Sequence, residues 1–198
     1  MAKSAAASAT SGKWISWTGF ETNDSTIAVM RFMDERYPQR KHPRMDHYDY
    51  STAGAYFITI CTDKRKCLLS HIVGRGLAPA ELRYTEYGRI AREQLLLLEQ
   101  RYSTLKVDCF VIMPNHIHAI LILKDTAGEG RRSTISDVVC TYKSLTTRVC
   151  KKVRPIDKLF QTSFYEHVIR GRNDYEEIAE YITNNPKQWE LDTLYAPE

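Results

Sequence analysis

Long apolar runs, paired cysteines and two widespread catalytic motifs are all missing from this sequence. No apolar run approaches the roughly 18 residues that cross a bilayer, and the Ala/Ser-rich start MAKSAAASAT has no apolar signal-peptide core. The five cysteines form no C-x-x-C pair, which argues against a disulfide scaffold and for free thiols. Neither a P-loop nor a Gly-x-Ser-x-Gly elbow occurs. We expect a soluble, intracellular protein.

The chain is long enough for one good hydrophobic core. With 198 residues, 43% of them hydrophobic, a single domain is expected rather than two. Residues 1–40 open with small side chains, lack sustained periodicity and include the turn-prone Pro38, so we interpret them as a flexible or loosely packed N-terminal extension. Residues 41–198 are then the folded domain.

The positive charge of the chain is concentrated in one stretch. Between residues 131 and 158 there are eight lysines and arginines and two acids, a local charge of +6, whereas the whole chain carries +4. All other residues therefore sum to −2. This asymmetry fits a site for a polyanion, although a charged helix face is more often an ordinary solvated face.

Hydrophobic periodicity predicts an α+β fold. Runs rich in β-branched and aromatic residues predict strands at 56–62, 107–113, 117–123 and 164–169. The second and third strands are expected to pair across the turn at Pro114-Asn115. Two further apolar stretches around Gly74-Arg75-Gly76 predict another hairpin.

Three helices are predicted between these strands. The first covers residues 85–102, and the second starts at Thr134 with an approximate capping box to Asp137. The third starts with Asn173 as N-cap and ends close to Asn185, because Pro186 disfavours helical geometry in the residue before it. The order of elements predicts a ferredoxin-like or RRM-like sandwich, an antiparallel sheet with helices mainly on one face.

Two histidines stand one residue apart at the start of a predicted strand, in MPNHIHAILIL (residues 113–123). Since side chains alternate along a strand, His116 and His118 leave the same face about 7 Å apart and can reach one cation. The alternative is that one histidine caps the turn and the other packs at a sheet edge. Two ligands also do not complete a metal site, so a third ligand must come from elsewhere.

The last predicted helix offers both a ligand and a nucleophile. Tyr181 and Asn185 are four residues apart and share a helix face. Tyr181 lies on the flank of the apolar stripe, where it can project a hydroxyl, although a partly buried structural tyrosine with an exposed hydroxyl is the more common case. Tyr142 is expected in the core, while Tyr165 and His167 alternate on the short fourth strand and are expected to pack there.

Four segments, in this order and spacing, resemble a known family. They are YDYSTAGAYFIT (48–59), VIMPNHIHAILIL (111–123), FYEHVIR (164–170) and YITNNPKQW (181–189). The match, from about Arg40 to Trp189, is similar to the REP-associated tyrosine transposases, relatives of the single-tyrosine HUH transposases of the IS200 type. Phe160 stands where relatives often have Trp, and residues before Arg40 have no counterpart.

The resemblance implies an enzyme and its site. The HUH motif falls on His116 and His118, the nucleophile on Tyr181, and the third metal ligand on Asn185. These residues would hold Mg²⁺ or Mn²⁺, of which imidazole ligands favour Mn²⁺. The implied activity is a metal-dependent single-stranded DNA endonuclease and strand transferase that forms a 5′-phosphotyrosine intermediate. Residues 41–198 would be the catalytic domain of a cytoplasmic, nucleoid-associated bacterial protein.

The implied substrate is single-stranded DNA beside a hairpin of the REP type, bound by a monomer. Basic side chains are expected to follow its backbone: Arg40, Lys41 and Arg44 before the core, and Arg131, Arg132, Lys143, Arg148, Lys151 and Lys152 in the basic stretch. Two alternatives stay open. A domesticated DNA-hairpin-binding module would form no covalent adduct, and a metal-dependent phosphodiester hydrolase would need the histidines but not Tyr181.

Overall fold

A four-stranded antiparallel sheet forms the centre of the molecule. The computed structural model describes residues 52–74, 81–125 and 133–197. The strands are β1 (Gly54–Cys61), β4 (Leu105–Ile112), β5 (His116–Leu123) and β6 (Tyr165–Ile169), in the spatial order β4-β5-β1-β6. With two consecutive helices between β1 and β4 and one helix between β5 and β6, the order in this sheet is βαββαβ, the predicted ferredoxin-like sandwich.

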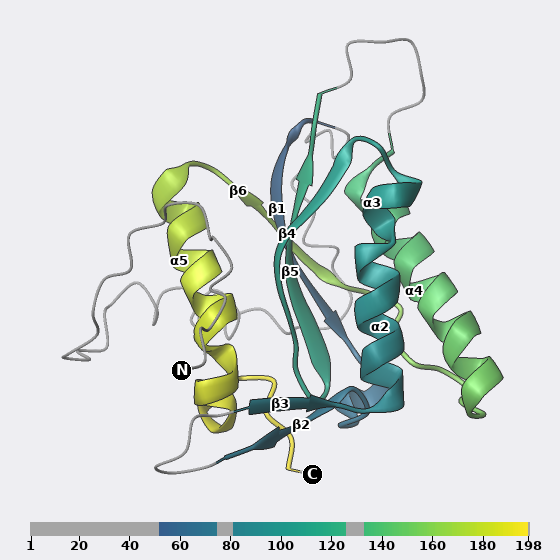
Figure 1. Cartoon of the computed structure of the whole chain (residues 1–198). Helices are drawn as coiled ribbons and strands as arrows, with labels where there is room; N and C mark the ends of the chain where they lie inside the picture. Colours follow the sequence, from purple (N-terminus) through teal and green to yellow (C-terminus); the bar gives the residue numbers. More distant parts are fainter. Residues whose placement is uncertain (1–51, 75–80, 126–132, 198) are drawn as a thin grey trace, which may run out of the picture.

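The two faces of the sheet are covered by different helices (Figure 1). Helices α2 (Glu86–Leu96) and α4 (Ile135–Val153) lie side by side on one face, over the side chains of Ile117, Ala119 and Leu121 of β5. Helix α5 (Arg172–Asn184) and the 3₁₀ segment η2 (Asn185–Leu191) cover the other face, where Ile120 packs against Ile182. The alternation of strand β5 therefore divides its residues between two cores.

A small hairpin and two short segments complete the described fold. Strands β2 (Ser70–Val73) and β3 (Glu81–Tyr84) pair in a separate two-stranded sheet. The 3₁₀ turn η1 (Asp63–Arg65) follows β1, and helix α3 (Leu98–Arg101) follows α2 after a break at Leu97. Residues 1–51, with the predicted extension, lie outside the described residues.

Helix α5 is fastened to the edge strand β4 at a bulge. The pairing of β4 with β5 shifts register between Val107 and Cys109, which leaves Asp108 without a paired position. Its carboxylate accepts hydrogen bonds from the Tyr175 hydroxyl of α5 and the Lys106 ammonium. The bulge thus turns an acidic side chain toward the first turns of the helix that carries Tyr181.

Most predicted elements are confirmed, and their differences are local. The Thr134/Asp137 capping box is present, β4 and β5 pair as predicted, and α5 ends at Asn184, where η2 begins with Asn185 and Pro186. The prediction that Asn173 caps α5 is wrong. The N-cap is Gly171, whose φ of 124° few residues other than glycine adopt.

Gly88 allows helix α2 to lie against the backbone before β2. A Cβ at this position would overlap the Leu69 carbonyl oxygen. Alanine normally stabilises a helix interior by about 0.5–1 kcal/mol relative to glycine, but here the overlap reverses the sign. We expect Gly88→Ala to lower the free energy of unfolding by about 1–3 kcal/mol, measured by urea denaturation. Arg92→Ala, on the exposed face of the same helix, is the control; equal stability of both variants would contradict the close packing.

Candidate metal and nucleophile site

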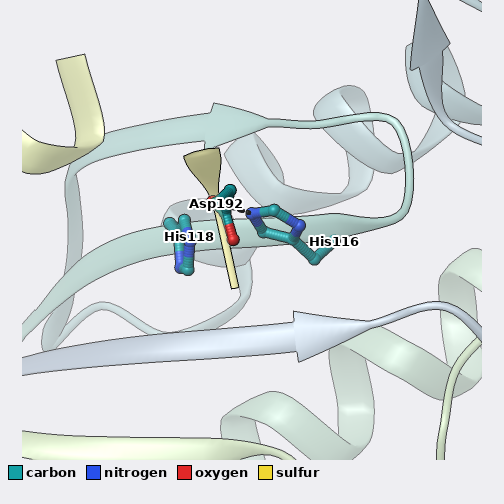
Figure 2. A group of neighbouring side chains, drawn as sticks. All are labelled: His116, His118 and Asp192. Atoms are coloured by element: carbon teal, nitrogen blue, oxygen red, sulfur yellow. Dashed lines mark ion pairs between the residues drawn. The ribbon is translucent and has the colours of Figure 1, made fainter. Parts of the chain in front are cut away.

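The two histidines lie on the face of the sheet that α5 covers. His116 and His118 are both fully buried, and their ring centroids are 4.4 Å apart. Figure 2 shows both rings near the carboxylate of Asp192, which comes from the segment after η2. One nitrogen of each ring and a carboxylate oxygen of Asp192 all lie within 4.8 Å of one another. The sequence-predicted pair is thus brought together with an acid far along the chain.

The buried amide of Asn115 fixes the proton position on His116. Asn115 Nδ2 donates to the carbonyl oxygens of Leu194 (2.8 Å) and Arg65 (3.3 Å), so its Oδ1 is the acceptor that faces His116 Nδ1, 2.8 Å away. His116 Nδ1 must then carry the hydrogen, because an amide oxygen only accepts. The lone pair of His116 consequently lies on Nε2, which points into the site.

His118 contacts both the sheet and the tyrosine helix. Its Nδ1 lies 2.8 Å from Thr59 Oγ1, on the neighbouring strand β1, and its Nε2 lies 3.2 Å from the Tyr181 hydroxyl. When Nδ1–H donates to Thr59, Nε2 accepts the phenol proton of Tyr181. Phe57 stacks on His118 and meets Tyr181 edge to face. The phenol is therefore held against the histidine pair.

Burial keeps both imidazoles neutral. It lowers the pKa of His116 to about 3, with the charge of Arg65 acting in the same direction and the Asn185 side chain opposing it. Burial, followed by the proximity of His116, places the pKa of His118 well below its usual range, while Asp192 acts in the opposite direction. Neutral imidazole is the form that binds metals.

Asn185 and Asp192 bring further acceptor atoms to the histidine pair. Asn185 Nδ2 donates to Asp192 Oδ2 at 2.7 Å, which leaves Asn185 Oδ1 as its second polar atom. Among the described residues, neither Asn185 Oδ1 nor His116 Nε2 has a hydrogen-bond partner. Asp192 Oδ2 lies 3.8 Å from His116 Nε2. Two buried acceptor atoms without a donor, next to a buried carboxylate, fit a cation.

Asp192 is the site residue that sequence reasoning missed. It follows η2, in a stretch with no helical or strand periodicity, and its side chain is held by the backbone N–H of Leu194 at 2.6 Å. The sequence contained only two signals for this ligand: Asp192 is acidic, and it lies seven residues after Asn185. Trp189, which packs on His116, lies three residues before Asp192, within η2, and covers this side of the site.

The predicted basic helix face lies across the sheet from the histidines. Lys143, Arg148, Lys151 and Lys152 line a groove between α4 and residues 160–162, whereas α4 packs on the opposite face from His116. Lys143 Nζ donates to the carbonyl oxygens of Thr162 (2.7 Å) and Ser163 (3.3 Å). The remaining basic candidates, Arg40, Lys41, Arg44, Arg131 and Arg132, lie outside the described residues.

The other ring residues take structural positions. Tyr142 is buried, and its hydroxyl donates to the Ala91 carbonyl oxygen, so the prediction of a core residue is confirmed. His167 Nε2 lies 3.1 Å from Asp174 Oδ2. Tyr165 packs edge to face on Phe57.

Comparison with known protein sequences identifies a relative of this chain. No family model matches the sequence. An uncharacterized protein of Haemophilus influenzae is 33% identical over 172 residues, which cover 79% of this chain and 93% of the relative. The chain belongs to the family of this Haemophilus protein.

The fold has a counterpart among solved structures. A REP-associated tyrosine transposase bound to a REP hairpin superposes with a TM-score of 0.54 and 22% identity, over 75% of this chain and 74% of the other. The chain has the fold of that transposase, so the fold that the sequence motifs implied is confirmed. Among the described residues, no helix combines the length and apolarity that a membrane span requires.

The buried histidines make the stability of the domain depend on pH. In the unfolded chain histidine binds a proton below about pH 6.5, whereas His116 in the folded state stays neutral down to about pH 3. The unfolded state then binds more protons, so stability falls as the pH drops from 6.5 toward 3. We expect the free energy of unfolding, from urea titrations at pH 7 and pH 4.5, to fall less in His116→Gln than in the wild type. The same fall in both proteins would contradict this account.

Proposed function

We propose that this protein is a metal-dependent single-stranded DNA endonuclease and strand transferase that uses Tyr181 as its nucleophile. The observation that carries the proposal is the position of the Tyr181 hydroxyl, 3.2 Å from His118 Nε2, beside buried acceptor atoms that suit a cation. The fold shared with a tyrosine transposase supports the same reaction class. Residues 41–198 would form the catalytic domain, preceded by the extension at 1–40.

The proposed cation ligands are His116, His118 and Asn185, with Asp192 as a fourth. His116 offers Nε2, which Asn115 keeps free of a proton, and Asn185 offers Oδ1. The carboxylate of Asp192 adds the negative charge that a divalent cation requires in a buried site. When bound, Mg²⁺ or Mn²⁺ polarises the scissile phosphate and stabilises the departing 3′-oxygen.

Tyr181 is proposed to attack phosphorus through its phenol oxygen. The bond between phosphorus and the DNA 3′-oxygen breaks as the bond to Tyr181 forms, and its electron pair stays on the 3′-oxygen. The proton that the phenol loses balances the one that this oxygen takes up. The product is a 5′-phosphotyrosine, which a second 3′-hydroxyl can attack to rejoin the strand.

His118 has one Nε2 lone pair, which it can give either to the Tyr181 proton or to a cation. The hydrogen bond to the phenol and ligation through this nitrogen therefore exclude each other. In the loaded site, Tyr181 must turn its hydroxyl toward another acceptor, and the scissile phosphate supplies one. Phe57 contacts the rings of both His118 and Tyr181, so it bounds this movement on one side with an apolar surface.

The proposed substrate is single-stranded DNA beside a hairpin. The solved transposase with this fold is bound to a REP hairpin, and basic residues on this chain are suited to a phosphate backbone. Arg148, Lys151 and Lys152 on α4 are proposed contacts, together with Arg40, Lys41, Arg44, Arg131 and Arg132. Lys143 is the weakest of the proposed contacts, since two backbone carbonyls already hold its ammonium. A monomer is the proposed state.

The covalent step has a direct test in Tyr181→Phe. We incubate the protein with Mn²⁺ and a labelled hairpin-bearing single-stranded oligonucleotide, then separate the products by denaturing gel electrophoresis. The wild type is expected to form a denaturation-resistant adduct, and Tyr181→Phe none, because phenylalanine has no nucleophilic oxygen. Tyr142→Phe, which also removes a buried tyrosine hydroxyl, is the matched control and keeps the adduct. Cleavage without an adduct would point to a hydrolase, and binding alone to a binding module.

The ligand set is tested by Mn²⁺ binding without DNA. We expect His116→Ala and Asp192→Asn each to weaken binding by tenfold or more, about 1.4 kcal/mol, in an electron paramagnetic resonance titration of free Mn²⁺. Asp192→Asn keeps the shape of the side chain and an oxygen for the Leu194 N–H but loses the acceptor for Asn185 Nδ2, so the melting temperature of each variant is measured alongside to check that the fold is preserved. His167→Ala removes a half-buried histidine away from the site and is expected to bind Mn²⁺ like the wild type. Unchanged binding by Asp192→Asn would leave only three protein ligands.

A further inference from the structure

The turn η1 places three consecutive basic residues beside the site, in an unusual backbone conformation. Lys64 and Arg65 have φ angles of 54° and 53°, and they are the non-glycine residues with positive φ among those described. Such a conformation costs roughly 1–2 kcal/mol per residue, and strained backbone gathers at functional sites. Glycine or asparagine would adopt this conformation more easily than lysine or arginine. The turn therefore keeps two basic side chains at positions where they strain the backbone.

Hydrogen bonds fix this turn to the residue that orients His116. The Asn115 amide donates to the Arg65 carbonyl oxygen and accepts from His116 Nδ1. Thr62 N donates to the Asn115 carbonyl oxygen at 2.8 Å, and Thr62 Oγ1 lies 2.8 Å from the Lys66 carbonyl oxygen. The side chain of Asn115 therefore links the backbone of the turn directly to His116, a proposed metal ligand. The positive charge of Arg65 helps to lower the pKa of His116, whereas the side chains of Lys64 and Lys66 are exposed to solvent.

A second groove joins the turn to the segment that follows α4. Lys64 and Lys66 line it from one side, and Arg154 and Lys158 from the other. The two sides are held together by the Asp63 N–H, which donates to the Leu159 carbonyl oxygen at 2.8 Å, and by the Lys158–Asp63 ion pair at 3.3 Å. Two acids, at 63 and 157, against four bases leave the groove positive.

The two basic grooves adjoin each other at residues 158–162. Phe160, Gln161 and Thr162 line the α4 groove, while the residues just before them line the groove at the turn. The segment itself is paired with the end of β1, through a bridge between Thr62 and Phe160 and the bond from Gln161 N to the Cys61 carbonyl oxygen. Positive charge thus continues from the α4 groove to the turn, whose backbone is hydrogen-bonded to Asn115, the residue that contacts His116.

We propose that the turn Lys64–Lys66 binds the phosphodiester backbone of a single DNA strand where that strand passes from the α4 groove to the His116–Tyr181 site. This assignment rests on the proposed function and adds Lys64, Arg65, Lys66, Arg154 and Lys158 to its DNA interface. It also gives a path between the basic face of α4 and a site on the opposite face of the sheet. Backbone phosphates match the charges without any requirement on base sequence.

Binding without catalysis tests the path. We measure anisotropy of fluorescein-labelled dT20 in EDTA between 50 and 200 mM KCl, with all proteins carrying Tyr181→Phe. Lys64→Gln/Lys66→Gln is expected to raise Kd about tenfold at 50 mM KCl and to reduce the slope of log Kd against log salt by about 1.4, since each single-strand phosphate contact contributes about 0.7. Arg101→Gln/Lys124→Gln removes the same charge from exposed positions near the other end of β5 and is expected to change Kd less than twofold.

The variant Lys64→Gly distinguishes the effect of the Lys64 charge on DNA binding from the effect of its backbone strain on stability. Glycine adopts φ of 54° freely, so the melting temperature is expected to rise by about 2–4 °C, while Kd for dT20 rises about threefold. Equal Kd and salt slope for the turn variants and the Arg101/Lys124 control would overturn the inference. If the wild type binds dT20 through the turn but forms no adduct with Tyr181 intact, the proposed function fails and this interface remains.

Discussion

The buried amide of Asn115 is the interaction on which the arrangement of the site depends. It joins three segments that are distant in sequence: the turn after β1 through Arg65, the start of β5 through His116, and the last described segment through Leu194. Because both amide hydrogens are used by carbonyl oxygens, its oxygen has one orientation, and the tautomer of His116 follows from it. Loss of this side chain would leave three buried polar groups to find new partners.

Strand β5 positions the two histidines, and helix α5 carries Tyr181, the proposed nucleophile. Strand β5 lies between β4 and β1, so His116 and His118 are held by hydrogen-bonded neighbours on both sides. Helix α5 brings Tyr181 against this rigid surface and is aligned by the contact of Tyr175 with the bulge residue Asp108. Burial of both rings accounts for the neutral imidazoles.

Local patterns in the sequence predicted the helices and strands. The position of Asp192 and the N-cap of α5 depend on long-range contacts, which these patterns do not show. The spacing of His116 and His118 specifies one face of a strand, and the spacing of Tyr181 and Asn185 specifies one face of a helix. Asp192 lies in an irregular segment whose path depends on tertiary contacts, so no periodicity points to it. Asn173 has a good N-cap side chain, but Asp174 accepts the Arg170 N–H and contacts His167, and the N-cap lies two residues earlier, at Gly171.

The dispersal of the site along the chain has a consequence for synthesis. His116 and His118 come from the middle of the sequence, whereas Tyr181, Asn185, Asp192 and Leu194 all follow residue 180. A growing chain can pair β1, β4 and β5 well before these later residues emerge, but the histidines then lack both the phenol and the acidic side chain. Between the synthesis of β5 and the docking of α5, the growing chain therefore holds the histidines without the proposed nucleophile, and the proposed site is assembled only after α5 and the segment behind it have docked.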